Sequence, residues 1–188
     1  MKKIVQDGNP VLRKIAKEVP IKDFKTLKFK KVLYDMSTSL ASQGDGVAIA
    51  APQIGYSLRI FAVAGKVFDP RFIRGKGIPP DAPTKEKDVY FINPVITKLS
   101  KKKAWLDEGC LSVRPIWGQV ERSVNATVEA YDEHGKKFTR GAGGLLAHIF
   151  QHETDHLDGV LFIDKARNVR EGYEKKEAGD EKLIMGNE

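Results

Sequence analysis

The sequence predicts an α+β fold in which mixed or antiparallel β-sheets surround one central helix, with further helices in the N-terminal part. Helical patterns lie within the first 42 residues, strand-like runs fill the middle of the chain, and one strongly patterned helix follows them. In a doubly wound protein, strands and helices alternate regularly, and they do not do so here. A chain of 188 residues is long enough for one buried core, so we expect residues 1–188 to form a single domain.

The N-terminal part predicts two helices. Asn9 followed by Pro10 is typical of a helix start, because asparagine caps the first turn and proline suits its first position. A short helix is therefore predicted over residues 11–16. A longer helix is predicted over residues 23–42, where apolar residues recur at helical spacing and Gly44 follows the end.

Strands are predicted where short runs of β-branched and aromatic residues are bounded by glycine and proline. These runs cover residues 46–49, 58–63, 89–99, 120–131 and 137–139, with a hairpin turn at 132–135. Four prolines and two glycines predict a long surface loop over residues 66–87. Residues 141–144 lead into the last helix, which Gly159 ends. The charged tail over residues 168–188 is expected to be partly helical or frayed.

Composition is that of a globular protein, with 41% hydrophobic and 30% charged residues. No apolar run is long enough to span a bilayer or to form a secretory signal. The single cysteine, Cys110, excludes an internal disulfide framework and indicates a reducing compartment. A net charge of +7 permits association with nucleic acid or the ribosome, although each lysine cluster alone is typical of a solvated surface.

The strongest local motif is H-E-x-x-H, spanning residues 152–156. On a helix, His152 and His156 share one face, so both imidazoles can bind one metal ion. Glu153 lies to one side, where a general base can reach a water molecule without binding the metal.

A catalytic metal site of this kind needs a third protein ligand and one open position. Phe162 stands where a metzincin would have its last histidine, so that pattern fails. Spacing alone allows the third ligand to be either a downstream glutamate or Cys110. The thiolate of Cys110 suits a divalent ion. The candidate glutamates are Glu171, Glu174 and Glu177.

Three segments in order resemble the signature motifs of the peptide deformylase family. They are Gly46-Val47-Ala48-Ile49-Ala50-Ala51-Pro52-Gln53, Glu108-Gly109-Cys110-Leu111-Ser112 and Gln151-His152-Glu153-Thr154-Asp155-His156. With the segments over residues 9–16 and 130–135, the similarity extends from about Ile4 to Ile163.

The resemblance implies a hydrolase that removes the formyl group from the formyl-methionine of nascent polypeptides. Cys110, His152 and His156 would hold the metal, with water as the fourth ligand. Glu153 would take a proton from that water and later protonate the departing amine. The side-chain amide of Gln53 and the backbone N–H of Leu111 would stabilise the oxyanion.

The resemblance also implies where the substrate binds. The peptide would add as a strand beside Val47 and Gly109, and Leu145 and His148 would form the wall or rim of the methionine pocket. Ferrous iron is the expected metal, with zinc, nickel and cobalt as alternatives. We expect a cytoplasmic protein of bacterial type, with an organelle left open. Transient association with the ribosome is expected. Binding to a membrane or to a specific nucleic-acid sequence is not expected.

One departure from the family pattern is Ala48, where glycine is usual. Its methyl group is expected to alter efficiency or substrate preference, by crowding the formyl group or by restricting the backbone. Two other interpretations compete with the deformylase: a peptidase that uses a downstream glutamate as ligand, and a ribosome- or nucleic-acid-associated homologue without activity.

Overall fold

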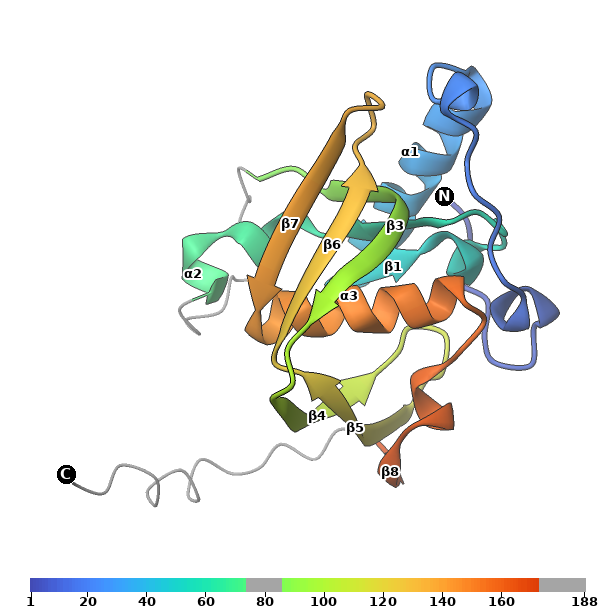
Figure 1. Cartoon of the computed structure of the whole chain (residues 1–188). Coiled ribbons are helices and arrows are strands. Elements are labelled where there is room, and N and C mark those ends of the chain that lie inside the picture. Colours follow the sequence, from blue (N-terminus) through green and yellow to red (C-terminus); the bar gives the residue numbers. More distant parts are fainter. Residues whose placement is uncertain (74–85, 173–188) are drawn as a thin grey trace.

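The computed structural model describes residues 1–73 and 86–172, which form two antiparallel sheets around one central helix (Figure 1). The α-helices are α1 (Leu27–Ala41), α2 (Pro70–Ile73) and α3 (Gly144–Leu157). The 3-10 helices are η1 (Pro10–Arg13), η2 (Ile21–Asp23), η3 (Ala51–Ile54), η4 (Gly65–Phe68) and η5 (Phe162–Asp164). The strands are β1 (Ala48–Ala50), β2 (Ile60–Val63), β3 (Val89–Leu99), β4 (Lys103–Gly109), β5 (Ile116–Ser123), β6 (Asn125–Tyr131), β7 (Lys137–Gly143) and β8 (Arg167–Glu171). The predicted α+β class is confirmed.

Helix α3 runs between the two sheets, as Figure 1 shows. The larger sheet has the strand order β1-β2-β3-β6-β7 and the smaller has the order β4-β5-β8, with antiparallel neighbours throughout. The helix packs on β6, β7 and β1 of the larger sheet and on β5 of the smaller. Its residues are therefore shielded by sheets on two sides.

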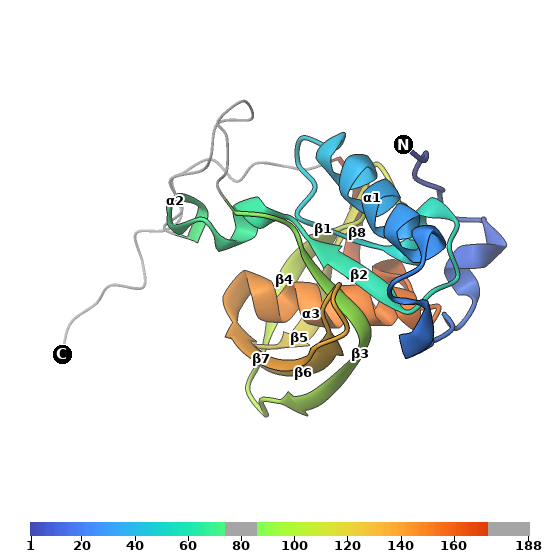
Figure 2. The ribbon, with the colours of Figure 1, turned by 90° about the horizontal axis from the view of Figure 1, so that it is seen from above.

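Both faces of the larger sheet are covered at its β1–β2 end, by α1 on one side and α3 on the other (Figure 2). Alternate strand residues point to opposite faces. Phe61 of β2 accordingly packs with Phe150 of α3, whereas its neighbour Ile60 packs in the cluster that contains Met36 of α1. Double burial explains why these two strands are apolar throughout instead of alternating.

The N-terminal helices are shorter than predicted. The predicted helix over 23–42 begins only at Leu27, because the Thr26 side chain caps it by accepting a hydrogen bond from the Phe29 N–H. The predicted helix over 11–16 is the single 3-10 turn η1, which Asn9 caps as expected and which ends where Lys14 turns extended.

The strand predictions miss two strands and join two others. The missed strands are β4 and β8, which both pair with β5. Their local patterns are weak, because β4 has only three consecutive apolar residues and β8 has one apolar residue. The predicted strand over 120–131 is two strands, β5 and β6, which belong to different sheets. β7 extends to Gly143, so the predicted glycine-rich lead over 141–144 lies mostly within a strand.

The predicted loop over 66–87 begins with η4 and α2, and residues 74–85 lie outside the described residues. Residues 173–188, which make up most of the predicted tail, lie outside them too. The assignment of residues 1–188 to one domain stays a prediction. In the part of the chain that the structure describes, no helix combines the length and apolar character needed to cross a membrane.

Candidate metal centre

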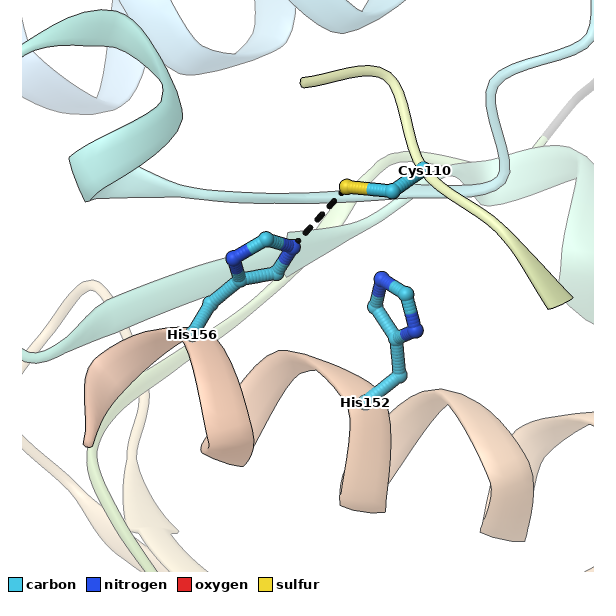
Figure 3. Close-up of side chains that lie close together, drawn as sticks. All are labelled: Cys110, His152 and His156. Carbon is cyan, nitrogen blue, oxygen red and sulfur yellow. Dashed lines mark hydrogen bonds between the residues drawn. The ribbon is translucent and has the colours of Figure 1, made fainter. Parts of the chain in front are cut away.

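The side chains of Cys110, His152 and His156 meet between the end of β4 and helix α3. Their ligand atoms all lie within 4.8 Å of one another, and Cys110 Sγ is 3.1 Å from His156 Nε2. Figure 3 shows the sulfur and both imidazole rings turned toward a common space. One thiol and two imidazoles in this arrangement are a donor set that fits zinc, cobalt, nickel or ferrous iron.

The local sequence explains how a thiol at the end of a strand comes to face a helix. β4 ends at Gly109, where a side chain would place its Cβ 2.9 Å from the ring of Trp117. Glycine lets the strand end approach that ring, and Cys110 follows directly. On α3, the spacing of four residues puts His152 and His156 on one face.

The downstream glutamates do not take the thiol's place in the described residues. Glu171 is an exposed residue of β8, paired with Ile116, and does not belong to the cluster. Glu174 and Glu177 lie outside the described residues.

A buried carboxylate that sequence reasoning missed lies beside the cluster. Glu108, only 2% exposed, contacts His152 Nδ1 through Oε2 at 2.7 Å and His148 Nε2 through Oε1 at 2.6 Å. The charge of Glu108 suggests that this strand end lies outside the core. The burial of Glu108 shows that this expectation is wrong. A bond to Nδ1 leaves Nε2 of His152 for the metal.

Arg122 makes the burial of Glu108 possible. Its guanidinium donates to both carboxylate oxygens, at 2.7 and 3.1 Å, and to Asp155 Oδ2 at 2.6 Å. Burial alone would raise the pKa of Glu108, but hydrogen bonds from His148, His152 and Arg122 hold that pKa well below its usual value. The sequence shows this glutamate and this arginine, but it gives no sign that they meet, because the pairing of their two strands was not predicted.

Glu153 has the environment expected of a general base. It is 4% exposed, and its Oε2 has no hydrogen-bond partner among the described residues. Burial raises the pKa of Glu153 to about 7. A carboxyl group poised near neutrality can both accept and return a proton.

Gln53 is fixed beside the thiol by its own side-chain bonds. Its Oε1 accepts from the Ala50 N–H at 2.8 Å, and its Nε2 donates to Ser112 Oγ at 3.1 Å and to Cys110 Sγ at 3.4 Å. One amide N–H is therefore directed at the thiol of the candidate metal site and the other at Ser112, and the role of Gln53 at the oxyanion stays a prediction. Leu111 follows Cys110 and lines the same space.

A cavity of about 550 Å³ opens beside these groups. The residues with a predicted site role that line it are Val47, Gln53, Gly109, Cys110, Leu111, Leu145, His148, His152 and Glu153. His156 does not line the cavity but lies behind it, buried, with its Nε2 toward the thiol. The structure thus brings the predicted catalytic, metal-binding and substrate-binding residues to one place.

Ala48 also lines the cavity. It lies within β1, paired with Val63, and among the described non-glycine residues only Asn93 and Asn168 have positive φ. The backbone at Ala48 is thus ordinary strand, so no conformation reserved for glycine is needed there. Crowding by the methyl group is the remaining part of the expectation.

Comparison with known proteins agrees with this geometry. The family model described as polypeptide deformylase matches residues 1–171. The peptide deformylase of Desulforudis audaxviator is 37% identical over 93% of this chain and 97% of its own, and that of Pseudothermotoga lettingae is 42% identical over 87% and 82%.

Solved structures are similar over most of the chain. A peptide deformylase from Plasmodium falciparum has a TM-score of 0.74 at 34% identity, covering 88% of this chain and 87% of that one. A Met-Ala-Ser-bound class I type b peptide deformylase from Acinetobacter baumannii has a TM-score of 0.74 at 32% identity, covering 88% and 98%. The chain therefore belongs to the polypeptide deformylase family of metal-dependent hydrolases.

Proposed function

We propose that this chain removes the N-formyl group from the formyl-methionine of nascent polypeptides, with residues 1–188 forming one catalytic domain. The observation that carries the proposal is the convergence of Cys110, His152 and His156 beside the unpartnered carboxylate of Glu153, at the wall of a cavity. The similarity to a deformylase that binds Met-Ala-Ser, a peptide beginning with methionine, supports this choice of substrate.

Cys110, His152 and His156 are the proposed ligands of one divalent ion. When bound, that ion supplies Lewis acidity, which makes water a nucleophile near neutral pH. Glu108 holds Nδ1 of His152, so that ring can offer only Nε2. Burial lowers the pKa of His156, which keeps its ring neutral and its lone pair available.

Glu153 is the proposed general base and acid. Its free Oε2 accepts a proton as water attacks the formyl carbon and returns that proton to the methionine nitrogen as the amide bond breaks. The Nε2–H of Gln53 and the backbone N–H of Leu111 are the proposed donors to the oxyanion that forms on the formyl oxygen. Removing one such donor costs about 2.7–4 kcal/mol of barrier lowering in other hydrolases.

The substrate is proposed to lie in the cavity between the β1 and β4 ends. Backbone groups of Val47 and Gly109 would pair with the peptide as an added strand, and both residues line the cavity. Leu145 and the side chain of His148, which Glu108 holds, would form part of the wall around the methionine side chain.

Ferrous iron is the proposed metal in the cell, with zinc, nickel and cobalt able to occupy the same donor set. Air should then inactivate the iron-loaded protein faster than the nickel-loaded protein. Equal decay of the two samples would contradict the choice of iron.

Cytoplasmic location and transient contact with the ribosome complete the proposal. The bacterial relatives support the cytoplasm, while a relative from Arabidopsis thaliana is named as chloroplastic or mitochondrial. A net charge of +7 is compatible with ribosome contact.

The test is release of formate from formyl-Met-Ala-Ser by anaerobically iron-loaded protein. Glu153→Gln should retain the metal and lose about 10²–10⁴-fold in kcat, because only the proton transfer is removed. No formate from the fully loaded wild-type protein would contradict the proposed function. Near-normal turnover by Glu153→Gln would contradict only the role of Glu153.

A further inference from the structure

A cluster of exposed lysines lies outside the cavity, around the start of α1. Residues 21–31 contain five lysines and one acidic residue, Asp23. All five lysines are exposed. Of these five, only Lys31 forms an ion pair with another described residue, namely Asp35. The remaining four define the basic face, namely Lys22, Lys25, Lys28 and Lys30.

The basic face does not help α1 to fold. The helix dipole places partial positive charge at the N-terminus, where Lys28 and Lys30 add more positive charge and no acidic residue offsets it. Helix α1 is held instead by the Thr26 cap and by its buried apolar side, which includes Phe29 and Met36. Charges that oppose the helix they sit on suggest an external partner.

Two exposed side chains of α1 near these lysines add a second feature. Leu27 is 84% exposed and Tyr34 is 65% exposed, and residues seven apart share one side of a helix. Lys30 lies on the same exposed side of α1, which Figures 1 and 2 show at the outside of the molecule. The surface thus combines clustered cations with one exposed aromatic ring.

We propose that the basic face binds the phosphate backbone of RNA without sequence preference, with Tyr34 stacking on a base. Clustered lysines bind phosphates by releasing counterions, and bases stack on exposed aromatic rings. A membrane is a poorer fit, because the continuous apolar side of α1 is already used in the core. A protein partner is a poorer fit, because lysine is depleted from protein interfaces.

This activity is separate from the chemistry at the metal centre. The residues that line the cavity begin at Asp45 in chain order and include none of α1. Helix α1 lies on the opposite face of the larger sheet from α3 (Figure 2). RNA binding goes beyond the proposed deformylation. Only the choice of ribosomal RNA as the cellular ligand rests on the proposed function.

The experiment compares two triple variants with the same change of charge, using poly(U) as the probe. Lys25, Lys28 and Lys30 are changed to Gln in the test variant, and Lys98, Lys101 and Lys102 in the control. The control lysines are exposed and lie around the β3–β4 turn, at the opposite end of the molecule from α1 in Figure 1. Far-UV circular dichroism and deformylation of formyl-Met-Ala-Ser check that both variants are folded.

The wild-type protein should bind poly(U) with an affinity that falls linearly with the logarithm of salt concentration. The test variant should bind at least about tenfold more weakly, and the magnitude of its salt slope should fall by about 0.7 for each phosphate that it no longer neutralises. Tyr34→Ala should lower the affinity about tenfold without changing the slope. Deformylation should be unchanged in all three variants.

Equal slopes for the wild-type protein and the test variant, or an equal fall in affinity in the control, would overturn the proposal. Binding to anionic lipid vesicles but not to poly(U) would overturn it in favour of a membrane. Failure of the wild-type protein to deformylate formyl-Met-Ala-Ser would instead contradict the proposed function and leave the binding result standing.

Discussion

At the scale of single residues, the metal centre depends on a carboxylate outside the H-E-x-x-H motif. Glu108 fixes Nδ1 of His152, and Arg122 compensates the buried charge of Glu108. Arg122 also contacts Asp155, which lies within the motif itself. One guanidinium therefore connects the end of β4 to helix α3 and, through Glu108, supports one proposed ligand, His152.

Arg122→Met should weaken both the fold and the metal site. Leaving Glu108 buried without its partner is expected to cost about 3–5 kcal/mol in the free energy of unfolding, measured with urea. Removing a residue that orients the ligands typically lowers metal affinity about 10–100-fold, measured by chelator competition.

Arg59→Met is the matched control for that prediction. Arg59 pairs with Asp158 just after α3, at 2.7 Å, and no hydrogen bond or ion pair joins the side chains of this pair to those of the proposed ligands. The control should cost about 1 kcal/mol or less and leave metal affinity unchanged. Equal decreases of metal affinity in the two variants would mean that Arg122 acts only through general stability.

Cys110→Ala should abolish tight metal binding, because two imidazoles alone leave the ion with too few protein ligands. Metal analysis of anaerobically purified protein measures this directly. A peptidase that uses a downstream glutamate would keep its metal in this variant, so full retention would favour that alternative.

The sequence predicted the proposed metal ligands, but it did not predict the buried residues that support one of them. The spacing of His152 and His156 follows from helix geometry, whereas Cys110 was assigned only through the resemblance to the deformylase motifs. Glu108 and Arg122 are distant in sequence and meet only through the pairing of β4 with β5. Nothing local in the sequence indicates that pairing.

At the scale of elements, predictions succeeded where an element carries its own pattern. β3 was predicted at its observed bounds, and α3 has both apolar periodicity and a glycine stop. β8 is mostly exposed and has one apolar residue, Val169, and β4 has only the short apolar run over residues 104–106. Their strand state is imposed by pairing, which a local pattern cannot show.

The turn after α3 offers a test at this scale. Gly159 has φ +76, and a Cβ there would lie 2.9 Å from the carbonyl carbon and oxygen of Arg13. Gly159→Ala should therefore combine backbone strain of about 1–2 kcal/mol with a clash against η1. Urea unfolding measures the total.

Gly8→Ala separates the two contributions. Gly8 also has positive φ, at +94, but nothing lies within 4 Å of the position its Cβ would occupy. This variant should show the strain alone, so Gly159→Ala should be the more destabilised. Equal destabilisation of the two variants would mean that the contact between the turn and η1 is unimportant.

At the scale of the whole molecule, α3 is central because one sheet packs on either side of it. The sequence predicted a central helix with mixed or antiparallel sheets around it, but not that the chain moves from the smaller sheet to the larger between β5 and β6. That change of sheet occurs at Val124, within one continuous strand-like stretch. Its cause is three-dimensional packing, which periodicity does not record.

A buried carboxylate that connects α1 to the segment after η3 should make stability depend on pH. Asp35 accepts hydrogen bonds from Lys31 and from the Tyr56 hydroxyl, and these lower the pKa of Asp35 below its usual value. A lowered pKa in the folded state stabilises the protein above the unfolded-state pKa of about 3.9, and this contribution is lost as pH falls through the folded-state pKa.

Asp35→Asn should therefore flatten the acid limb of the stability curve. Between about pH 5 and about pH 2, the free energy of unfolding should fall less in the variant than in the wild-type protein. Urea unfolding at a series of pH values measures both. Parallel curves would show that the pKa of Asp35 does not differ between the folded and unfolded states.

The most direct test of the proposed metal centre is X-ray absorption spectroscopy of the zinc-loaded protein, with Cys110→Ser as control. The proposed ligand set predicts sulfur scattering at about 2.3 Å and nitrogen scattering at about 2.0–2.1 Å in the wild-type protein, with the sulfur signal absent from the control. A wild-type spectrum without sulfur at bonding distance would contradict the proposed binding of one ion by Cys110, His152 and His156.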